Sequence, residues 1–255
     1  MGKSNAKPGK RLSVPAYDYT LFGEVDECPL DNIRQIIGRR MTASWQTVPH
    51  VTHHDEVDIT ELENLRHRLN EAMGAGDQKL SPLSFIIKAC ISGLKEFPDV
   101  NASLDETGKI LYLKRYYNIG MAVDTKDGLI VPVLKEADGL SVSGIAAAAA
   151  QLAEKARSGR LGFADAEGGT FTVTSLGKIG GTAFTPIINA PEVAILGVSR
   201  ARKKPVEYGG YGGEIALRLM LPLSLSYDHR VIDGAKAARF MGFVRDLLEH
   251  PEGMV

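Results

Sequence analysis

The residues best suited to acid–base chemistry lie together in the segment PLSLSYDHRVIDG, residues 222–234. Its first half alternates apolar with small or polar residues, which is the pattern of a half-buried strand. After Gly234 the apolar residues recur at helical spacing. His229 and Asp233 therefore stand between a strand and a helix, where side chains can reach a cleft and a histidine can move protons near neutral pH.

Each polar residue of this segment also has a structural interpretation. A lone histidine at the end of a strand is more often a hydrogen-bonded structural residue than a catalyst. Asp233 precedes a helix, so it can cap that helix by accepting a backbone N–H bond, a role compatible with catalysis. Arg230 lies between Asp228 and Asp233, and we expect it to form an ion pair in the wall of a site.

The composition narrows the class of protein. The chain has 255 residues, of which 44% are hydrophobic, and a formal net charge of -1. It can bury one large core or two small ones, and nothing in its charge indicates a nucleic-acid or membrane-surface partner. No apolar run reaches the roughly 18–20 residues of a membrane span. We expect Cys90 to be a buried thiol and no metal site at His50, His53 and His54, because these histidines are closely spaced on a strand without a nearby cysteine.

Periodicity along the chain predicts intermixed helices and strands, the α/β class. Residues 1–16 are expected to be a linker or an expression remnant, and residues 17–30 an extended arm. Helices are expected near residues 30–45, 60–73, 82–94, 141–157 and 234–250. Strands are expected near residues 51–59, 110–115, 116–125, 128–135, 168–177, 191–199 and 215–227.

Local signals define several of these boundaries. Thr60 and Glu63 match a capping box at the start of the second helix. Pro82 suits the first position of the third helix, and Ser141 suits the cap of the fourth. The sequence TKDG, residues 125–128, predicts a hairpin. The glycine-rich segments GKIGG and YGGYGG do not match a phosphate-binding loop, which argues against a nucleotide hydrolase or a Rossmann dehydrogenase.

Several segments resemble one enzyme family. His229-Arg230-Val231-Ile232-Asp233-Gly234 resembles the H-x-x-x-D-G signature of dihydrolipoamide acyltransferases, the core subunits of 2-oxo acid dehydrogenase complexes. Chloramphenicol acetyltransferase shares their fold and a related motif. The similar segments occur in the same order as in the family, from about residue 17 to about residue 248. The segment GGTAFTPIINAPEVAILGVS is most similar to the pyruvate branch of the family, the acetyltransferases. It is carried by FGEVDECPL, VPHVTHHDEVDITELE, DTKDGLIVPVL, GTFTVTSLGKIGGTAFTPIINAPEVAILGVS and LMLPLSLSYDHRVIDG.

The resemblance implies acetyl transfer between the thiols of dihydrolipoamide and coenzyme A. His229 would be the general base that removes the thiol proton. Thr174, at a position where the family commonly has serine, would stabilise the oxyanion, with Ser175 as the fallback. A β-branched residue chosen only for the sheet is the structural alternative for Thr174. Neighbours alternate between the two faces of a strand, so Ser175 is expected to point away from Thr174.

The resemblance also implies supporting residues. Asp233 would orient the site through an arginine, for which Arg40 is the best candidate. Phe184 and Leu196 would line the route to the thiols, although plain core packing explains them nearly as well. Coenzyme A and lipoamide would be substrates, and no cofactor or metal would be bound in this domain.

The expected architecture is a chloramphenicol-acetyltransferase-like fold, a mixed β-sheet with flanking helices, assembled as a trimer with active sites between subunits. Eight trimers would form a cubic 24-mer through the C-terminal helix and Met254–Val255. The chain shows no lipoyl-type DKA motif, so residues 17–255 are expected to be the catalytic domain alone. Partners would be the lipoyl domain and, through upstream domains, the 2-oxo acid decarboxylase and dihydrolipoamide dehydrogenase.

Alternative functions remain at this point. The chain could be a succinyl- or branched-acyl transferase of a related complex, a structural core subunit without catalysis, or an enzyme that acetylates a small molecule. Retention of His229, Asp233 and a hydroxyl at Thr174 favours an enzyme over a scaffold. The bacterial cytoplasm is favoured over the mitochondrial matrix as its location.

Overall fold

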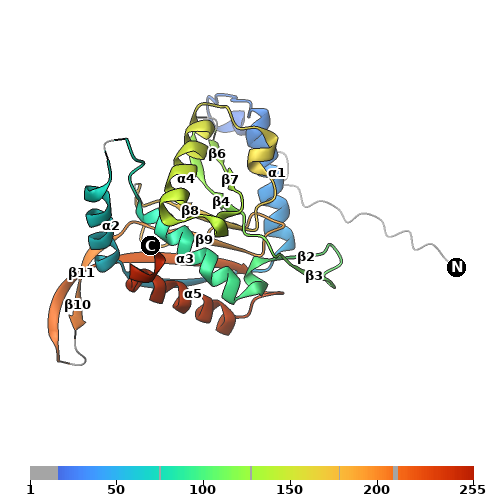
Figure 1. Ribbon diagram of the computed structural model, residues 1–255. Helices are drawn as coiled ribbons and strands as arrows, with labels where there is room; N and C mark the ends of the chain where they lie inside the picture. The colour runs from blue at the N-terminus through green and yellow to red at the C-terminus, as the bar shows by residue number, and fades with distance from the viewer. Residues whose placement is uncertain (1–16, 75, 127, 178, 209–211) are drawn as a thin grey trace.

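The computed structural model describes residues 17–74, 76–126, 128–177, 179–208 and 212–255, so the expected linker at residues 1–16 lies outside the described residues. A mixed sheet with the strand order β1-β11-β9-β8-β4-β7 runs through the molecule, and β10 pairs with β11 beyond the end of β9 (Figure 1). The β8–β9 and β4–β8 pairs are parallel and the others antiparallel. The strands of this sheet are β1 (His50–Asp58), β4 (Ile119–Met121), β7 (Val133–Leu134), β8 (Phe171–Ser175), β9 (Ala194–Val198), β10 (Arg202–Tyr208) and β11 (Glu214–Asp228).

Two short hairpins lie outside the central sheet. They are β2 (Ala102–Leu104) with β3 (Leu111–Leu113), and β5 (Val123–Thr125) with β6 (Gly128–Ile130). The second of them confirms the hairpin predicted at TKDG. The 3-10 helices are η1 (Tyr19–Phe22), η2 (Pro98–Asn101), η3 (Ala137–Gly139), η4 (Phe163–Ala166) and η5 (Pro251–Met254).

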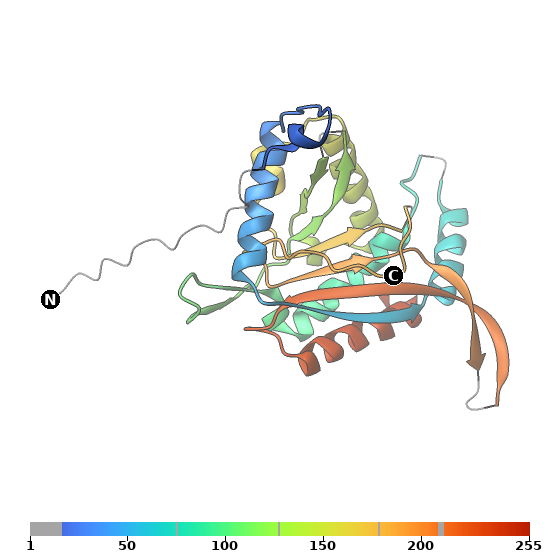
Figure 2. The same cartoon turned by 180° about the vertical axis from the view of Figure 1, so that it is seen from behind.

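Helices cover the apolar face of the sheet. The α-helices are α1 (Asn32–Thr47), α2 (Thr60–Ala72), α3 (Pro82–Glu96), α4 (Val142–Arg157) and α5 (Gly234–Glu249). The α3 helix is buried for most of its length because its sequence is apolar nearly all round, and it packs between α4 and α5. Figures 1 and 2 show α3 and α5 on one face of the sheet and the β10–β11 hairpin extending beyond the body. No helix in the described part of the chain is long and apolar enough to cross a membrane.

Two of the predicted strands are interrupted. The segment 116–125 leaves the central sheet after β4 and enters the small hairpin at β5. The segment 128–135 breaks between β6 and β7, where Pro132 has no N–H to continue a ladder. The β10 strand was not predicted, because its sequence RKKPVEY is charged and contains a proline, features of an edge strand rather than of a core strand.

The capping box predicted at Thr60 is wrong. The residue that caps α2 is Ile59, and Thr60 is the first helical residue. The Thr60 hydroxyl donates to Asp58 at 2.6 Å and accepts the N–H of Leu219 at 2.8 Å. Glu63 pairs instead with Arg66 at 2.8 Å. The Thr60 hydroxyl therefore connects α2 to β11 by a hydrogen bond. The local sequence pattern gives no sign of this tertiary contact.

The C-terminal segment differs from the expected docking tail. Met254, at the end of η5, is buried in the chain's own hydrophobic core, while Val255 is exposed. Of the two residues expected to contact another trimer, only Val255 is therefore available for such a contact.

Candidate active site

One face of the central sheet is polar at its middle. Thr174 of β8 lies beside Gly197 of β9, Gly197 is opposite Ser224 of β11, and Ser224 is opposite His54 of β1. Paired residues point to the same face, and the Ser224 hydroxyl lies 2.8 Å from His54 Nδ1. The other face carries the apolar residues of β11 that pack on the helices. A polar sheet face of this kind can support a site.

Thr174 is buried on this polar face. Ser175, its neighbour, is exposed, which agrees with the alternation along β8. Within the described residues the Thr174 hydroxyl has no hydrogen-bond partner, so its proton is available to a bound group. The end of the Phe184 ring lies close to Gly197, because a Cβ atom at position 197 would meet Phe184 Cζ at 2.7 Å. Phe184 is therefore brought next to the strand neighbour of Thr174.

His229 lies in the turn between β11 and α5 and is exposed. Its backbone N–H donates to the Pro49 carbonyl at 3.1 Å. Its ring is tilted by 31° against the Tyr227 ring, with 5.9 Å between the centroids. Neither ring nitrogen of His229 has a hydrogen-bond partner among the residues that the structure describes. An imidazole in this state can accept a proton from a substrate.

An ion pair between the buried Asp228 and the half-exposed Arg230 flanks His229 in the sequence. The Asp228 carboxylate accepts hydrogen bonds from Arg230 Nε at 2.9 Å and Arg230 Nη2 at 2.6 Å, and from the Arg230 backbone N–H at 3.0 Å. The hydrogen bond to Asp228 raises the pKa of Arg230. The ion pair expected for Arg230 is present, and its partner is Asp228.

Asp233 is the N-cap of α5, so the structural interpretation of this residue is confirmed. Its Oδ1 accepts the backbone N–H of Lys236 at 2.7 Å. This hydrogen bond lowers the pKa of Asp233, and the charges of Arg239 and Lys236 act in the same direction. Arg40 is exposed on α1, and in the described part of the single chain it forms no ion pair with Asp233. An Arg40–Asp233 contact would have to join two chains.

His229 and Thr174 of one chain lie far apart. Thr174 is level with Ser224 across β9, and His229 follows Ser224 by five residues. At about 3.3 Å per residue, the four strand steps from Ser224 to Asp228, where β11 ends, already separate the two positions by roughly 13 Å along the sheet. His229 and Thr174 of one chain are therefore well separated on the sheet.

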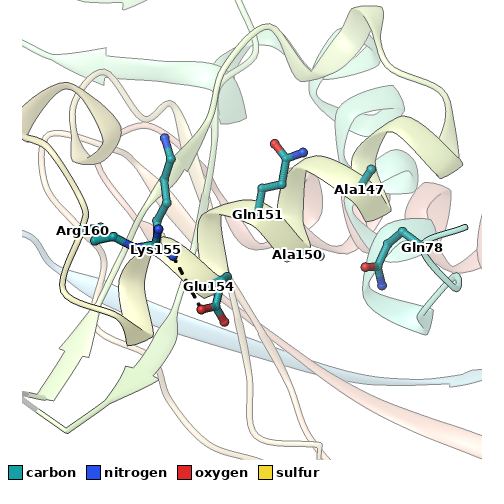
Figure 3. Close-up of a pocket in the computed structure, with 7 residues that line it drawn as sticks. All are labelled: Gln78, Ala147, Ala150, Gln151, Glu154, Lys155 and Arg160. Atoms are coloured by element: carbon teal, nitrogen blue, oxygen red, sulfur yellow. Dashed lines mark ion pairs between the residues drawn. The ribbon is translucent and has the colours of Figure 1, made fainter. Parts of the chain in front are cut away.

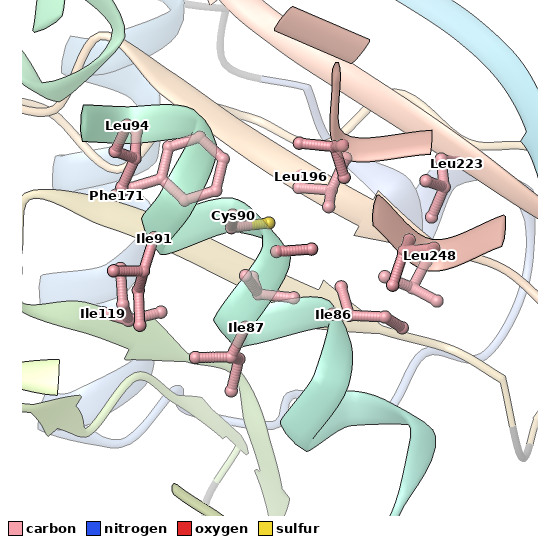
Figure 4. Close-up of a cluster of buried hydrophobic side chains, with 14 of the residues drawn as sticks. Ile86, Ile87, Cys90, Ile91, Leu94, Ile119, Phe171, Leu196, Leu223 and Leu248 are labelled. Carbon is pink, nitrogen blue, oxygen red and sulfur yellow. The ribbon is translucent and has the colours of Figure 1, made fainter. Parts of the chain in front are cut away.

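Leu196 does not line the polar face. It is fully buried in the hydrophobic core, and its strand neighbours Ile195 and Gly197 alternate to the other face. Figure 4 shows it among side chains that include those of Cys90 and Leu223. The expected role in a route to the thiols therefore does not agree with its position, and core packing describes it.

Sequence reasoning missed Glu192, an acidic residue beside the polar face. Glu192 is buried, and its carboxylate accepts a hydrogen bond from the Thr172 hydroxyl at 2.7 Å. Asn189 Nδ2 donates to the other carboxylate oxygen at 3.4 Å. Burial raises the pKa of Glu192 to about 7. A Cβ atom on Gly169 would lie 2.7 Å from the carboxylate, so this glycine leaves room for it. The only signal in the sequence is an acidic residue at the start of an apolar strand.

Two surface hollows occur in the described part of the chain. One of about 480 Å³ lies along α4 and contains a Glu154–Arg160 ion pair at 3.7 Å (Figure 3). Another of about 360 Å³ is lined by His54 and by Thr182 and Ala183, which precede Phe184. Neither of these two hollows contains His229 or Thr174.

Cys90 and His50 have structural surroundings. Burial raises the pKa of the Cys90 thiol to about 12, so Cys90 is a core residue. His50 Nε2 accepts the Ile188 N–H at 3.0 Å, and His50 Nδ1 donates to the Val48 carbonyl at 2.8 Å. Among the described residues no cluster of histidine, cysteine or acidic side chains could hold a metal ion.

Comparison with known proteins identifies close relatives. The dihydrolipoyllysine-residue acetyltransferase component of the pyruvate dehydrogenase complex of Cupriavidus necator is 51% identical over 237 residues, which is 93% of this chain and 42% of the relative. The corresponding protein of Azotobacter vinelandii is 52% identical over 91% of this chain and 36% of its own length. The chain thus spans about two fifths of the length of these relatives.

Solved structures give the same result for the fold. A crystal structure of A. vinelandii dihydrolipoamide acetyltransferase, from a study of a serine, a histidine and an asparagine in its catalytic mechanism, has a TM-score of 0.91 and 50% identity, covering 95% of this chain and 99% of the other. Chloramphenicol acetyltransferase, at 14% identity, covering 82% of this chain and 94% of its own, has a TM-score of 0.55, so the likeness concerns the fold alone.

The predicted fold, a mixed sheet with flanking helices of the chloramphenicol-acetyltransferase type, is confirmed by these structures. The family model for the catalytic domain of 2-oxoacid dehydrogenase acyltransferases matches residues 22–255. This match spans the described sheet, its polar face and the His229 turn. The chain therefore belongs to the 2-oxoacid dehydrogenase acyltransferase family, of which it contains the catalytic domain.

Proposed function

We propose that this domain transfers an acetyl group between dihydrolipoamide and coenzyme A, as the core of a pyruvate dehydrogenase complex. The observation that carries the proposal is the exposed His229, held at the end of β11 with both ring nitrogens unoccupied within the described chain. The relatives at about 50% identity are acetyltransferase components of that complex, which supports acetyl as the acyl group.

The proposed reaction begins with a thiol whose pKa is about 8.5 or higher, so most of it is protonated at neutral pH. His229 takes this proton while the sulfur attacks the thioester carbonyl carbon. The carbonyl oxygen becomes an oxyanion and accepts a hydrogen bond from the Thr174 hydroxyl. The intermediate then collapses, the C–S bond to the second thiol breaks, and the imidazolium returns the proton to the departing sulfur.

We place each active site between two chains of a trimer, with His229 from one chain and Thr174 from its neighbour. The separation of roughly 13 Å along the sheet between Ser224, level with Thr174, and the end of β11 supports this arrangement. In the A. vinelandii enzyme, the studied asparagine follows the studied histidine by four residues. Asp233 has the same spacing from His229, and we assign it to orient the site, with Arg40 of another chain as its partner.

The N-terminal arm supports the trimer. Within the described residues its apolar side chains are exposed, and an apolar surface of this extent marks an interaction site. Cyclic symmetry would let one type of contact build three equal sites. The exposed residues are Tyr17, Tyr19, Leu21 and Phe22. One solved relative with a TM-score of 0.91 is the cubic core of a pyruvate dehydrogenase complex, so we propose a 24-mer as the higher assembly.

Phe184 is assigned to the wall of the site, since its ring lies on the strand neighbour of Thr174. The remaining partners follow from the proposed complex: a lipoyl domain as acyl carrier, and the decarboxylase and dihydrolipoamide dehydrogenase subunits. The named relatives are bacterial, and we propose the bacterial cytoplasm as the location.

The test is a steady-state assay of dihydrolipoamide with acetyl-, succinyl- and isobutyryl-coenzyme A. The proposal expects the highest kcat/KM with acetyl-coenzyme A. A higher value with succinyl- or isobutyryl-coenzyme A would assign the domain to a related complex. Transfer to chloramphenicol but not to dihydrolipoamide would make it a small-molecule acetyltransferase, and no transfer at all would leave a structural core.

A further inference from the structure

We propose that Arg230 is a positioning residue, which holds the catalytic His229 through a bidentate ion pair with Asp228. The two members of the pair flank His229 in the sequence. Three N–H donors of Arg230, two in its side chain and one in its backbone, hydrogen-bond to the same carboxylate. The inference rests on the proposed function, because it assigns a role relative to the general base.

This pair differs from an ordinary surface ion pair. The Asp228 side chain is only 3% exposed, whereas the Arg230 side chain is 42% exposed. Exposed pairs contribute little, but removal of one partner of a buried charge leaves the other uncompensated. Planar bidentate contact also fixes the direction of both groups, which a single hydrogen bond does not. Asp228 therefore depends on the Arg230 guanidinium.

The pair acts on the backbone that carries the imidazole. The Asp228 carbonyl accepts the N–H groups of Val231 and Ile232, both at 3.0 Å, which closes the turn. The His229 N–H is held by the Pro49 carbonyl at 3.1 Å. The chain is thus fixed on both sides of His229, while the imidazole has no hydrogen bond of its own within the described residues. Its direction depends on this backbone and on the Tyr227 ring beside it.

A general base must lie within hydrogen-bond reach of the proton it removes, and a misplacement of about 1 Å can cost 10²-fold in rate. Loss of the guanidinium should therefore lower turnover without weakening the binding of coenzyme A. The competing role for a half-exposed arginine is direct contact with the phosphates of coenzyme A. That role would raise the KM for coenzyme A instead.

The experiment compares Arg230→Gln and Arg230→Lys with the matched control Arg68→Gln, which removes an exposed arginine from a surface pair with Glu252. The measured quantities are kcat, the KM for coenzyme A, the assembly mass and the thermal midpoint. We expect Arg230→Gln to lower kcat by about 10-fold to 100-fold at unchanged KM and mass. Arg230→Lys should retain more activity, added guanidinium ion should partly restore Arg230→Gln, and Arg68→Gln should behave as wild type.

A double variant separates positioning from other roles. In a His229→Ala background, Arg230→Gln should cause no further loss, because the residue acts only through His229. A raised KM for coenzyme A, or an equal further loss without His229, would overturn the inference. If Arg230→Gln does not assemble, wild-type kcat in Arg230→Lys would overturn it. Full turnover in the single variant His229→Ala would refute the proposed function. Wild-type kcat in the Arg230 variants would refute only the inference about Arg230, so the two failures can be told apart.

Discussion

Replacement of Glu192 by glutamine should change the pH dependence of stability. Glu192 is buried against Thr172, with Asn189 at 3.4 Å and the charged amine of Lys114 nearby. Burial raises its pKa from 4.5 to about 7, so between these values the folded chain holds a proton that the unfolded chain has released. The free energy of unfolding contributed by this group must therefore fall as pH rises from about 4.5 to about 7.

The magnitude follows from the shift of the pKa. A rise of roughly 2.5 units, at about 1.36 kcal/mol per unit, corresponds to about 3 kcal/mol of unfolding free energy. The full stability is present below the unfolded pKa and is lost as pH rises through the folded pKa. Glutamine keeps an acceptor for the Thr172 hydroxyl and cannot ionise. The variant should therefore lie within about 1 kcal/mol of wild type near pH 5 and exceed it by up to about 3 kcal/mol near pH 8.

Urea unfolding at fixed protein concentration, followed by circular dichroism from pH 5 to pH 8, measures this difference. Glu106→Gln is the control, since Glu106 is exposed; its difference from wild type should not depend on pH. A Glu192→Gln variant whose difference from wild type is constant across the range would refute the reasoning. A variant that loses relative stability as pH rises would also refute it, because the sign would be opposite.

Further substitutions test the site. His229→Ala should lower kcat by at least ~10²-fold with an unchanged thermal midpoint, and near-normal turnover would exclude it as the base. Thr174→Ala should lower kcat by about 10²- to 10³-fold and Thr174→Ser by little; if Ser175→Ala is the damaging change, the hydroxyl is wrongly assigned. Gly197→Ala places a Cβ atom 2.7 Å from Phe184 Cζ, so it should cost about 1–3 kcal/mol of stability and lower kcat. Wild-type stability and kcat in Gly197→Ala would show that the Phe184 ring can move without affecting either quantity.

Much of the fold could be predicted because local patterns and packing agree. The helices that became α1, α3, α4 and α5 have periodic apolar residues, and the predicted caps at Ser141 and Asp233 hold their helices. The failures have tertiary causes. Thr60 matches a local cap pattern, but its hydroxyl is used by β11. The break after β4 depends on which neighbouring strand is available, and no local pattern reports this.

The residue types of the candidate site could be predicted from the sequence, but the positions of their side chains could be predicted less well. His229 and Thr174 stand at positions that the family motif marks, and alternation places Ser175 on the other face of β8. Leu196 was misassigned because an apolar residue in a family block looks the same whether it faces the site or the core. The dependence of Asp228 on Arg230 requires the turn itself, since two residues of separation do not imply a bidentate contact.

The central claim is that one active site takes His229 and Thr174 from different chains, and mixed trimers test it most directly. Each of the variants His229→Ala and Thr174→Ala should be nearly inactive alone. When both are co-expressed in equal amounts and assemble at random, about a quarter of the sites should combine an intact histidine with an intact threonine from the neighbour. We therefore expect about a quarter of wild-type kcat per site in the mixture. A mixture no more active than its components would show that both groups act within one chain, and would contradict the account.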